Sequence, residues 1–135
     1  MKPFFFFFLA VLIIAGCQST PVTGETVTAG EGSYRNITPA ALQTMLKETD
    51  FVLINVHIPF AGNIPDTDLS IPYDEIGRNL SELPADKSAQ IVLYCRSGRM
   101  SEIAAQELVS LGYTNVWNLR GGMLDWEQAG FALEK

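Results

Sequence analysis

The chain has 135 residues, and its 9 lysine and arginine residues against 15 aspartate and glutamate residues give a net charge of −6. A chain of this length argues against two domains, because single cores form from about 100 to 150 residues. The acidic balance argues against nucleic acid as a partner, since phosphates are bound by basic surfaces.

The chain begins with a weakly basic segment followed by a short apolar run. Residues 1–3 include Lys2, residues 4–14 are all apolar, and the small pair Ala15-Gly16 follows. This arrangement is typical of a secretory signal peptide. A helix of this length rises about 16 Å, roughly half of a bilayer core, so it is too short to span a membrane. We therefore expect residues 1–16 to be a signal peptide that is removed.

The end of this segment, Ile14-Ala15-Gly16-Cys17, resembles the lipobox of bacterial lipoproteins. The resemblance implies that Cys17 carries diacylglycerol, and two acyl chains such as palmitate hold a protein stably at a membrane. We expect a lipoprotein of the cell envelope, anchored to a membrane and facing the periplasm or the cell exterior. The alternative is an ordinary signal peptide followed by an incidental cysteine.

The segment after the anchor is rich in threonine, glycine, serine and glutamate and has no helical period. Such a composition predicts a flexible tether over residues 17–33, which places the folded domain at residues 34–135. Within it, Thr38 and Pro39 are typical of a helix start, and Leu42, Met45 and Leu46 share one helical face. The next segment, Phe51 to Val56, is apolar and rich in β-branched residues, which predicts a strand buried on both faces.

The second half of the domain repeats the alternation of strand and helix. An irregular stretch, Ile64 to Pro72, and a weaker helical segment, Tyr73 to Leu83, precede an apolar strand over Ile91 to Tyr94. A helix over Met100 to Leu111 follows, with Gly112 as its left-handed cap. A strand over Val116 to Leu119 then leads to the Gly121-Gly122 break and a last helix with four inward residues: Met123, Leu124, Trp126 and Ala129. This alternation predicts an α/β fold with a central, mostly parallel sheet and helices on both faces.

Cys95 is the candidate reactive residue of the sequence. It follows a buried strand and precedes a helix, and this edge of an α/β sheet is where ligands bind. If Cys17 is lipidated, Cys95 is the only thiol of the mature chain, so it forms no internal disulfide. Gly98, inward amides and the guanidinium groups of Arg96 and Arg99 would stabilise a thiolate. This interpretation requires the sulfur to face the loop amides; the alternative is a small hydrophobic residue sealed in the core.

The loop and four other stretches together resemble the single-domain rhodaneses, a sulfurtransferase family. The stretches are Asp50 to Val56, Ile71 to Ile76, Tyr94 to Ser101, Leu111 to Tyr113 and Leu119 to Trp126, in the order in which the family has them, and the resemblance covers residues 35–135. It implies a rhodanese-like fold and an enzyme that moves sulfane sulfur from a small donor, thiosulfate or a persulfide, to a thiol or to cyanide.

The resemblance also implies the roles of the site residues. Cys95 would be the catalytic nucleophile that carries a persulfide. The substrate-binding residues would be those of the loop that follows it: Arg96, Ser97, Gly98, Arg99, Met100 and Ser101. Amides of the loop would hold the negative persulfide, and the two arginines would orient a sulfonate. We expect no cofactor and no metal, since one histidine and one free cysteine make a poor ligand set, and we expect a monomer.

The chain departs from the family at two places. Many relatives carry Asp-x-Arg where this chain has Asn55-Val56-His57, so an ion pair is lost and Asn55 is left with hydrogen bonding to a loop. His57 could donate a proton, although a structural position is favoured. Relatives also often have a histidine where this chain has Asn63, to which we assign no role.

Two other functions are weighed against sulfur transfer. Cysteine-dependent phosphatases need an arginine at the sixth position after the cysteine, where this chain has Ser101, which disfavours phosphoryl transfer. The stronger alternative is a binding module at the envelope that takes up a sulfur carrier or a redox partner with little turnover.

Overall fold

The computed structural model describes Gly16 and residues 21–135, so Cys17 and residues 1–15 of the expected signal peptide lie outside the described residues. In the described part of the chain, no helix is long and apolar enough to cross a membrane. The elements in chain order are β1 (Glu25–Ala29), β2 (Gly32–Ile37), α1 (Pro39–Glu48), β3 (Val52–Asn55), β4 (Leu69–Ser70), the 3-10 helices η1 (Ile76–Arg78) and η2 (Leu80–Glu82), β5 (Ile91–Tyr94), α2 (Arg99–Ser110), β6 (Val116–Leu119) and α3 (Gly122–Gln128).

The strands form one six-stranded sheet in the order β1-β2-β6-β5-β3-β4. Only β1 and β2 pair antiparallel, and the other neighbours are parallel. The sheet therefore has β5 and its parallel neighbours β3 and β6 at its centre, with their carboxyl ends at one edge. The predicted α/β class with a mostly parallel sheet is confirmed.

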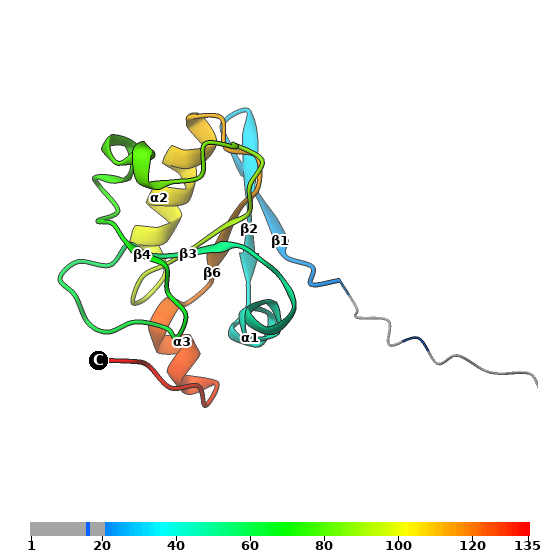
Figure 1. Cartoon of the computed structure of the whole chain (residues 1–135), viewed down its shortest axis with the longest axis vertical. Coiled ribbons are helices and arrows are strands. Elements are labelled where there is room, and N and C mark those ends of the chain that lie inside the picture. The colour runs from blue at the N-terminus through cyan, green and yellow to red at the C-terminus, as the bar shows by residue number, and fades with distance from the viewer. Residues whose placement is uncertain (1–15, 17–20) are drawn as a thin grey trace, which may run out of the picture.

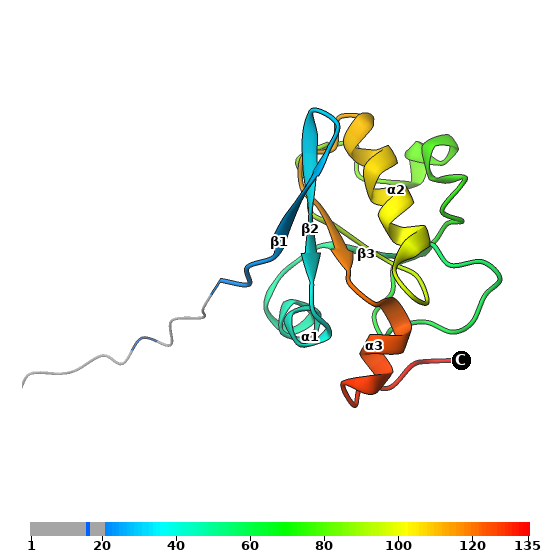
Figure 2. The same cartoon turned by 180° about the vertical axis from the view of Figure 1, so that it is seen from behind.

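Helices cover both faces of this sheet (Figures 1 and 2). One core lies between the sheet and α2, which contributes Ala104, Ala105 and Leu108. The other lies between the sheet and the pair α1 and α3, to which Met45 and Trp126 belong. Because apolar side chains of β3 and β5 are buried in both cores, these strands are held from both faces, as their continuous apolar sequences predict.

The β1–β2 hairpin corrects the predicted boundary between tether and domain. The tether was expected to reach Ser33, yet Glu25–Ala29 pairs along its whole length with β2. Its β-branched residues favour a strand, and the two-residue turn has Gly30 at its first position with a φ of 59°. The prediction of a flexible segment up to residue 33 is wrong, because the alternating residues around Val27 form a strand once they pair with β2.

The predictions for the helices are confirmed in part. Thr38 caps α1 by accepting a hydrogen bond from the Ala41 amide, and Gly112 ends α2 with a φ of 93°, both as expected. The helix expected over residues 73–83 is instead the two short helices η1 and η2. In α3 only Met123 and Trp126 of the four predicted inward residues are buried, because a short helix buries one stripe at a spacing of three.

The first prediction tests whether β1 is part of the domain. Val27 is half-buried against the core beside α2, whereas its neighbour Thr28 is exposed. Val27→Asp should lower the free energy of unfolding by about 1–3 kcal/mol, because it brings a poorly solvated carboxylate to the core. Thr28→Asp should change it by less than about 0.5 kcal/mol. Urea unfolding measures both, and equal, small effects would mean that this segment is a tether after all.

Candidate active site

Cys95 lies directly after β5, at the carboxyl edge of the central strands. Gly98 has a φ of 108°, which turns the chain back so that α2 begins at Arg99. The amide of Gly98 donates a hydrogen bond to the Cys95 sulfur at 3.0 Å. The Ser101 hydroxyl lies 3.4 Å from the same sulfur and donates to the Gly98 carbonyl at 3.0 Å. The loop thus brings one amide and one hydroxyl to the sulfur, where the nucleophile interpretation expects several inward amides.

The burial of Cys95 differs from what a solvent-open nucleophile would show. The residue is 1% exposed and belongs to the core beside α2. Burial alone matches the alternative of a small core residue. The two polar contacts do not, because a cysteine that only fills space has no need of an amide donor and a hydroxyl. In this structure the Cys95 sulfur makes polar contacts and is closed to solvent.

The start of α3 holds this loop from outside. The Met123 amide donates to the Cys95 carbonyl at 2.9 Å, and the Leu124 amide donates to the Arg96 carbonyl at 3.0 Å. The C=O and N–H of a trans peptide point in opposite directions. The two carbonyls point at α3, so the amides of Arg96 and Ser97 point away from α3.

Gly122 allows this approach of α3 to the loop. Its φ is 57°, and a Cβ there would lie 2.3 Å from the Cys95 carbonyl oxygen and 2.7 Å from the Arg96 carbonyl carbon. A side chain therefore cannot be placed at this position without moving α3 or the loop. The Gly121-Gly122 pair, which the sequence marks only as a break, is part of the candidate site.

The other predicted site residues surround the sulfur on the surface. Arg96, Ser97 and Arg99 are exposed, and Met100 is half-buried. The one ion pair among residues 21–135 joins Arg120 to Glu25 at 3.5 Å, so Arg96 and Arg99 have no carboxylate partner there. Their charge is free to meet an anion, whereas the buried Gly98 and Ser101 act on the sulfur itself.

Asn55 bonds to a loop, as expected for the residue that replaces the usual aspartate. It is 2% exposed, and its Nδ2 donates to the Gly62 carbonyl at 3.0 Å and to Asn63 Oδ1 at 2.9 Å. Its Oδ1 accepts from the His57 amide at 3.0 Å. Asn63, to which the sequence assigned no role, therefore fastens this loop, and its backbone also pairs with Glu134.

His57 lies near the loop and is half-buried. Desolvation, and then the positive charge of Arg96, lower the pKa of its imidazole below the ordinary value of 6.5. The imidazole is therefore neutral at neutral pH and adds no positive charge beside Arg96.

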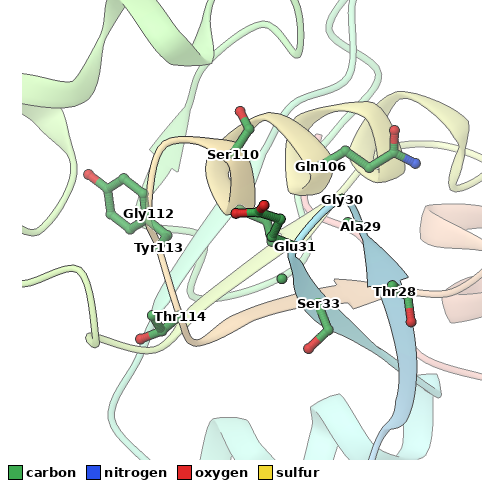
Figure 3. A pocket seen from close by; sticks show the side chains of 12 residues that line it. Thr28, Ala29, Gly30, Glu31, Ser33, Gln106, Ser110, Gly112, Tyr113 and Thr114 are labelled. Atoms are coloured by element: carbon green, nitrogen blue, oxygen red, sulfur yellow. The ribbon is translucent and has the colours of Figure 1, made fainter.

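A cavity lies at the other end of the molecule. It has a volume of about 880 Å³ and lies between the β1–β2 turn and the C-terminal end of α2, where Figure 3 shows Glu31, Gln106 and Ser110 around it. None of residues 95–101 lines it. Among the described residues there is also no group of three His, Cys, Asp or Glu side chains that could hold a metal ion.

Comparison with known proteins identifies the family to which the chain is similar. The model of the rhodanese-like domain family matches residues 38–129. A protein named sulfurtransferase from Allochromatium vinosum is 37% identical over 94 residues, which are 67% of this chain and 85% of that protein. The thiosulfate sulfurtransferase GlpE of Glaesserella parasuis is 26% identical over 77% of this chain and 96% of its own length.

A solved structure gives the same assignment. The rhodanese-related protein of Thermoplasma volcanium has a TM-score of 0.63 at 27% identity, covering 74% of this chain and 97% of that one. With a family match over more than half of its length and a sheet of the same kind, this chain belongs to the family of rhodanese-like domains.

Proposed function

We propose that this protein is a sulfurtransferase that carries sulfane sulfur on Cys95. The observation that carries the proposal is the amide of Gly98 at 3.0 Å from the Cys95 sulfur, at the start of α2. A donor fixed in this position stabilises the negative charge of the Cys95 thiolate, both as the nucleophile and as the leaving group of the second displacement. Relatives named for sulfur transfer support the same reaction class.

The reaction proceeds in two displacements. With thiosulfate as donor, the Cys95 thiolate attacks the outer sulfur, an S–S bond forms, and sulfite leaves with the electron pair of the bond that breaks. In the second displacement a thiolate or cyanide attacks the outer sulfur of the persulfide, and the Cys95 thiolate leaves. Neither displacement needs a metal or a redox cofactor, because the electron pairs come from the nucleophiles.

The loop supplies the groups that these steps need. The amides of Arg96 and Ser97, which point away from α3, are available to a second sulfur atom or to the donor. The unpaired guanidinium groups of Arg96 and Arg99 bind and orient the sulfonate of thiosulfate. Phosphoryl transfer fits less well, because the hydroxyl of Ser101 is bonded to the Gly98 carbonyl where a phosphatase needs a guanidinium group.

A binding module with little turnover is the second candidate. Two observations favour it: Cys95 is 1% exposed, and an amide, Asn55, replaces the usual carboxylate. In that function the persulfide forms slowly or serves as a stored sulfur, and the partner is a sulfur carrier or redox protein of the envelope. The two candidates differ in the second displacement, which only the enzyme repeats.

We also propose that Cys17 is lipidated and holds the domain at a membrane of the cell envelope, facing the periplasm or the exterior. The support is the lipobox-like sequence before Cys17, which lies outside the described residues. With β1 starting at Glu25 and Val22 packed against the core beside α1 and α3, the tether is shorter than the expected residues 17–33.

The second prediction tests the nucleophile. After treatment with thiosulfate, mass spectrometry should find one additional sulfur atom on the peptide that contains Cys95, and Cys95→Ser should gain none. With cyanide present, wild-type protein should form thiocyanate over many turnovers. Sulfur uptake without turnover supports the binding module, and identical spectra for the two proteins contradict both.

The third prediction tests the contact between α3 and the loop. Gly122→Ala should slow sulfur uptake by Cys95 about 100-fold, the cost of a displacement of about 1 Å at a reacting centre. Gly130→Ala is the matched control, because Gly130 has a φ of 92° but open space around its Cβ position. Its rate should equal the wild-type rate, with about 1 kcal/mol lost in stability. Stopped-flow loading with thiosulfate measures both rates, and equal slowing would assign the effect to backbone strain alone.

The fourth prediction tests the anchor. In a bacterium that expresses the full chain, labelled palmitate should enter the wild-type protein and the Cys95→Ser variant to the same extent. Cys17→Ser should carry no label and should leave the membrane fraction, because the thioether to lipid cannot form. Label on Cys17→Ser would show that the lipid, if any, is elsewhere.

A further inference from the structure

The exposed large hydrophobic side chains of the described residues lie around the Cys95 loop. They are Ile58 (37% exposed), Phe60 (63%), Ile103 (42%) and Leu124 (43%), here called the apolar rim. Single exposed apolar residues are common on protein surfaces. A group gathered about one loop is the kind of patch that marks an interaction site.

Two residues of the apolar rim are connected to the arginines of the loop. The Leu124 amide donates to the Arg96 carbonyl, so this residue sits directly against the loop backbone. Ile103 is four residues after Arg99 in α2, and residues at this spacing are neighbours on one helix face. Leu124 therefore has its backbone against that of Arg96, and Ile103 shares a helix face with Arg99.

The other two residues reach the loop through the sheet. Asn55 at the end of β3 pairs with Tyr94, and the Val56 amide donates to the Tyr94 carbonyl at 2.9 Å. The segment that carries Ile58 and Phe60 thus leaves the sheet beside Cys95. Both overall views show this segment, the start of α2 and α3 gathered at one end of the molecule, opposite the β1–β2 turn (Figures 1 and 2).

The surface between these residues is charged and is not part of the large cavity. Arg96 and Arg99 are exposed and have no ion-pair partner among residues 21–135, and the cavity of about 880 Å³ is lined by none of residues 95–101. Small ligands gain affinity by being enclosed, whereas an exposed apolar patch with charges at its centre suits a macromolecular surface.

We propose that the apolar rim docks a protein that presents a cysteine thiol, with apolar and acidic residues beside it, as the acceptor of sulfur from Cys95. The proposal rests on the proposed function and names its acceptor class. The partner's thiolate attacks the outer sulfur of the Cys95 persulfide, an S–S bond forms on the partner, and the Cys95 thiolate leaves. Apolar contacts to Phe60 and Leu124 hold the partner, and its carboxylates pair with Arg96 and Arg99.

A protein is favoured over a bilayer as the occupant. Asp125 is exposed next to Leu124, so the apolar rim carries charges of both signs. An anionic lipid surface would repel this carboxylate, whereas a protein can place a charge of either sign opposite each group. A bilayer also brings no thiol to the sulfur.

The test compares thiol acceptors on protein that has first been loaded with sulfur and checked by mass. The acceptors are 2-mercaptoethanol and two pentapeptides with a central cysteine between leucines, one ending in glutamates and one ending in lysines. At equal thiolate concentration, wild-type protein should transfer sulfur to the acidic peptide about tenfold faster than to either other acceptor. The double variant Ile58→Ser, Phe60→Ser should lose this advantage and keep the rate with 2-mercaptoethanol.

The matched control is Thr26→Ala, Thr28→Ala, which changes exposed residues of β1 and should behave as wild type. Equal rates for the acidic peptide with wild type and the rim variant would overturn the proposal. A second result would also overturn it. The wild type, but not the rim variant, would sediment with vesicles of phosphatidylserine and phosphatidylcholine, while the two proteins would transfer sulfur to the peptides at the same rates. If wild-type protein takes up no sulfur from the donor, the proposed function fails, and the docking proposal fails with it. This outcome is distinguished from the others because loading is checked by mass first.

Discussion

The site depends on two backbone hydrogen bonds, from the amides of Met123 and Leu124 in α3 to the carbonyls of Cys95 and Arg96. They join the last helix of the chain to the loop that follows the central strand. These bonds turn the two carbonyls toward α3, so the amides of Arg96 and Ser97 point away from α3. The loop residues alone would not ensure this orientation. Gly122 makes the bonds possible, because its missing side chain lets the helix start lie against the loop backbone.

The parts of the fold that were predictable are those with a strong local pattern. Local sequence and tertiary structure agree where a pattern predicts only one secondary structure. Examples are the continuous apolar runs of β3 and β5, the proline at the start of α1 and the glycine at the end of α2. The segment before residue 34 is predicted as a tether but contains β1, because this strand is short and gains its stability from pairing with β2. A strand of this kind is decided by its partner, which composition does not show.

The sequence predicts the location of the site better than the contacts that its groups make. Cys95 and its loop stand out through position, glycine and charge, and the structure brings Gly98 and Ser101 to the sulfur. The contribution of α3 and the bonds of Asn63 come from segments distant in sequence, so no spacing rule could find them. The burial of Cys95 was likewise not expected, since it depends on how tightly the loop closes.

The direction of β1 decides from which side the chain enters the domain. Because β1 runs antiparallel to β2, Glu25 lies at the edge where β2 and β6 end, and its carboxylate is 3.5 Å from the guanidinium group of Arg120, the residue before Gly121. The chain therefore enters β1 at the edge that carries the reactive sulfur. One reversed edge strand thus places the entry of the described chain at the edge of the sheet that carries the reactive sulfur, and not at the cavity end.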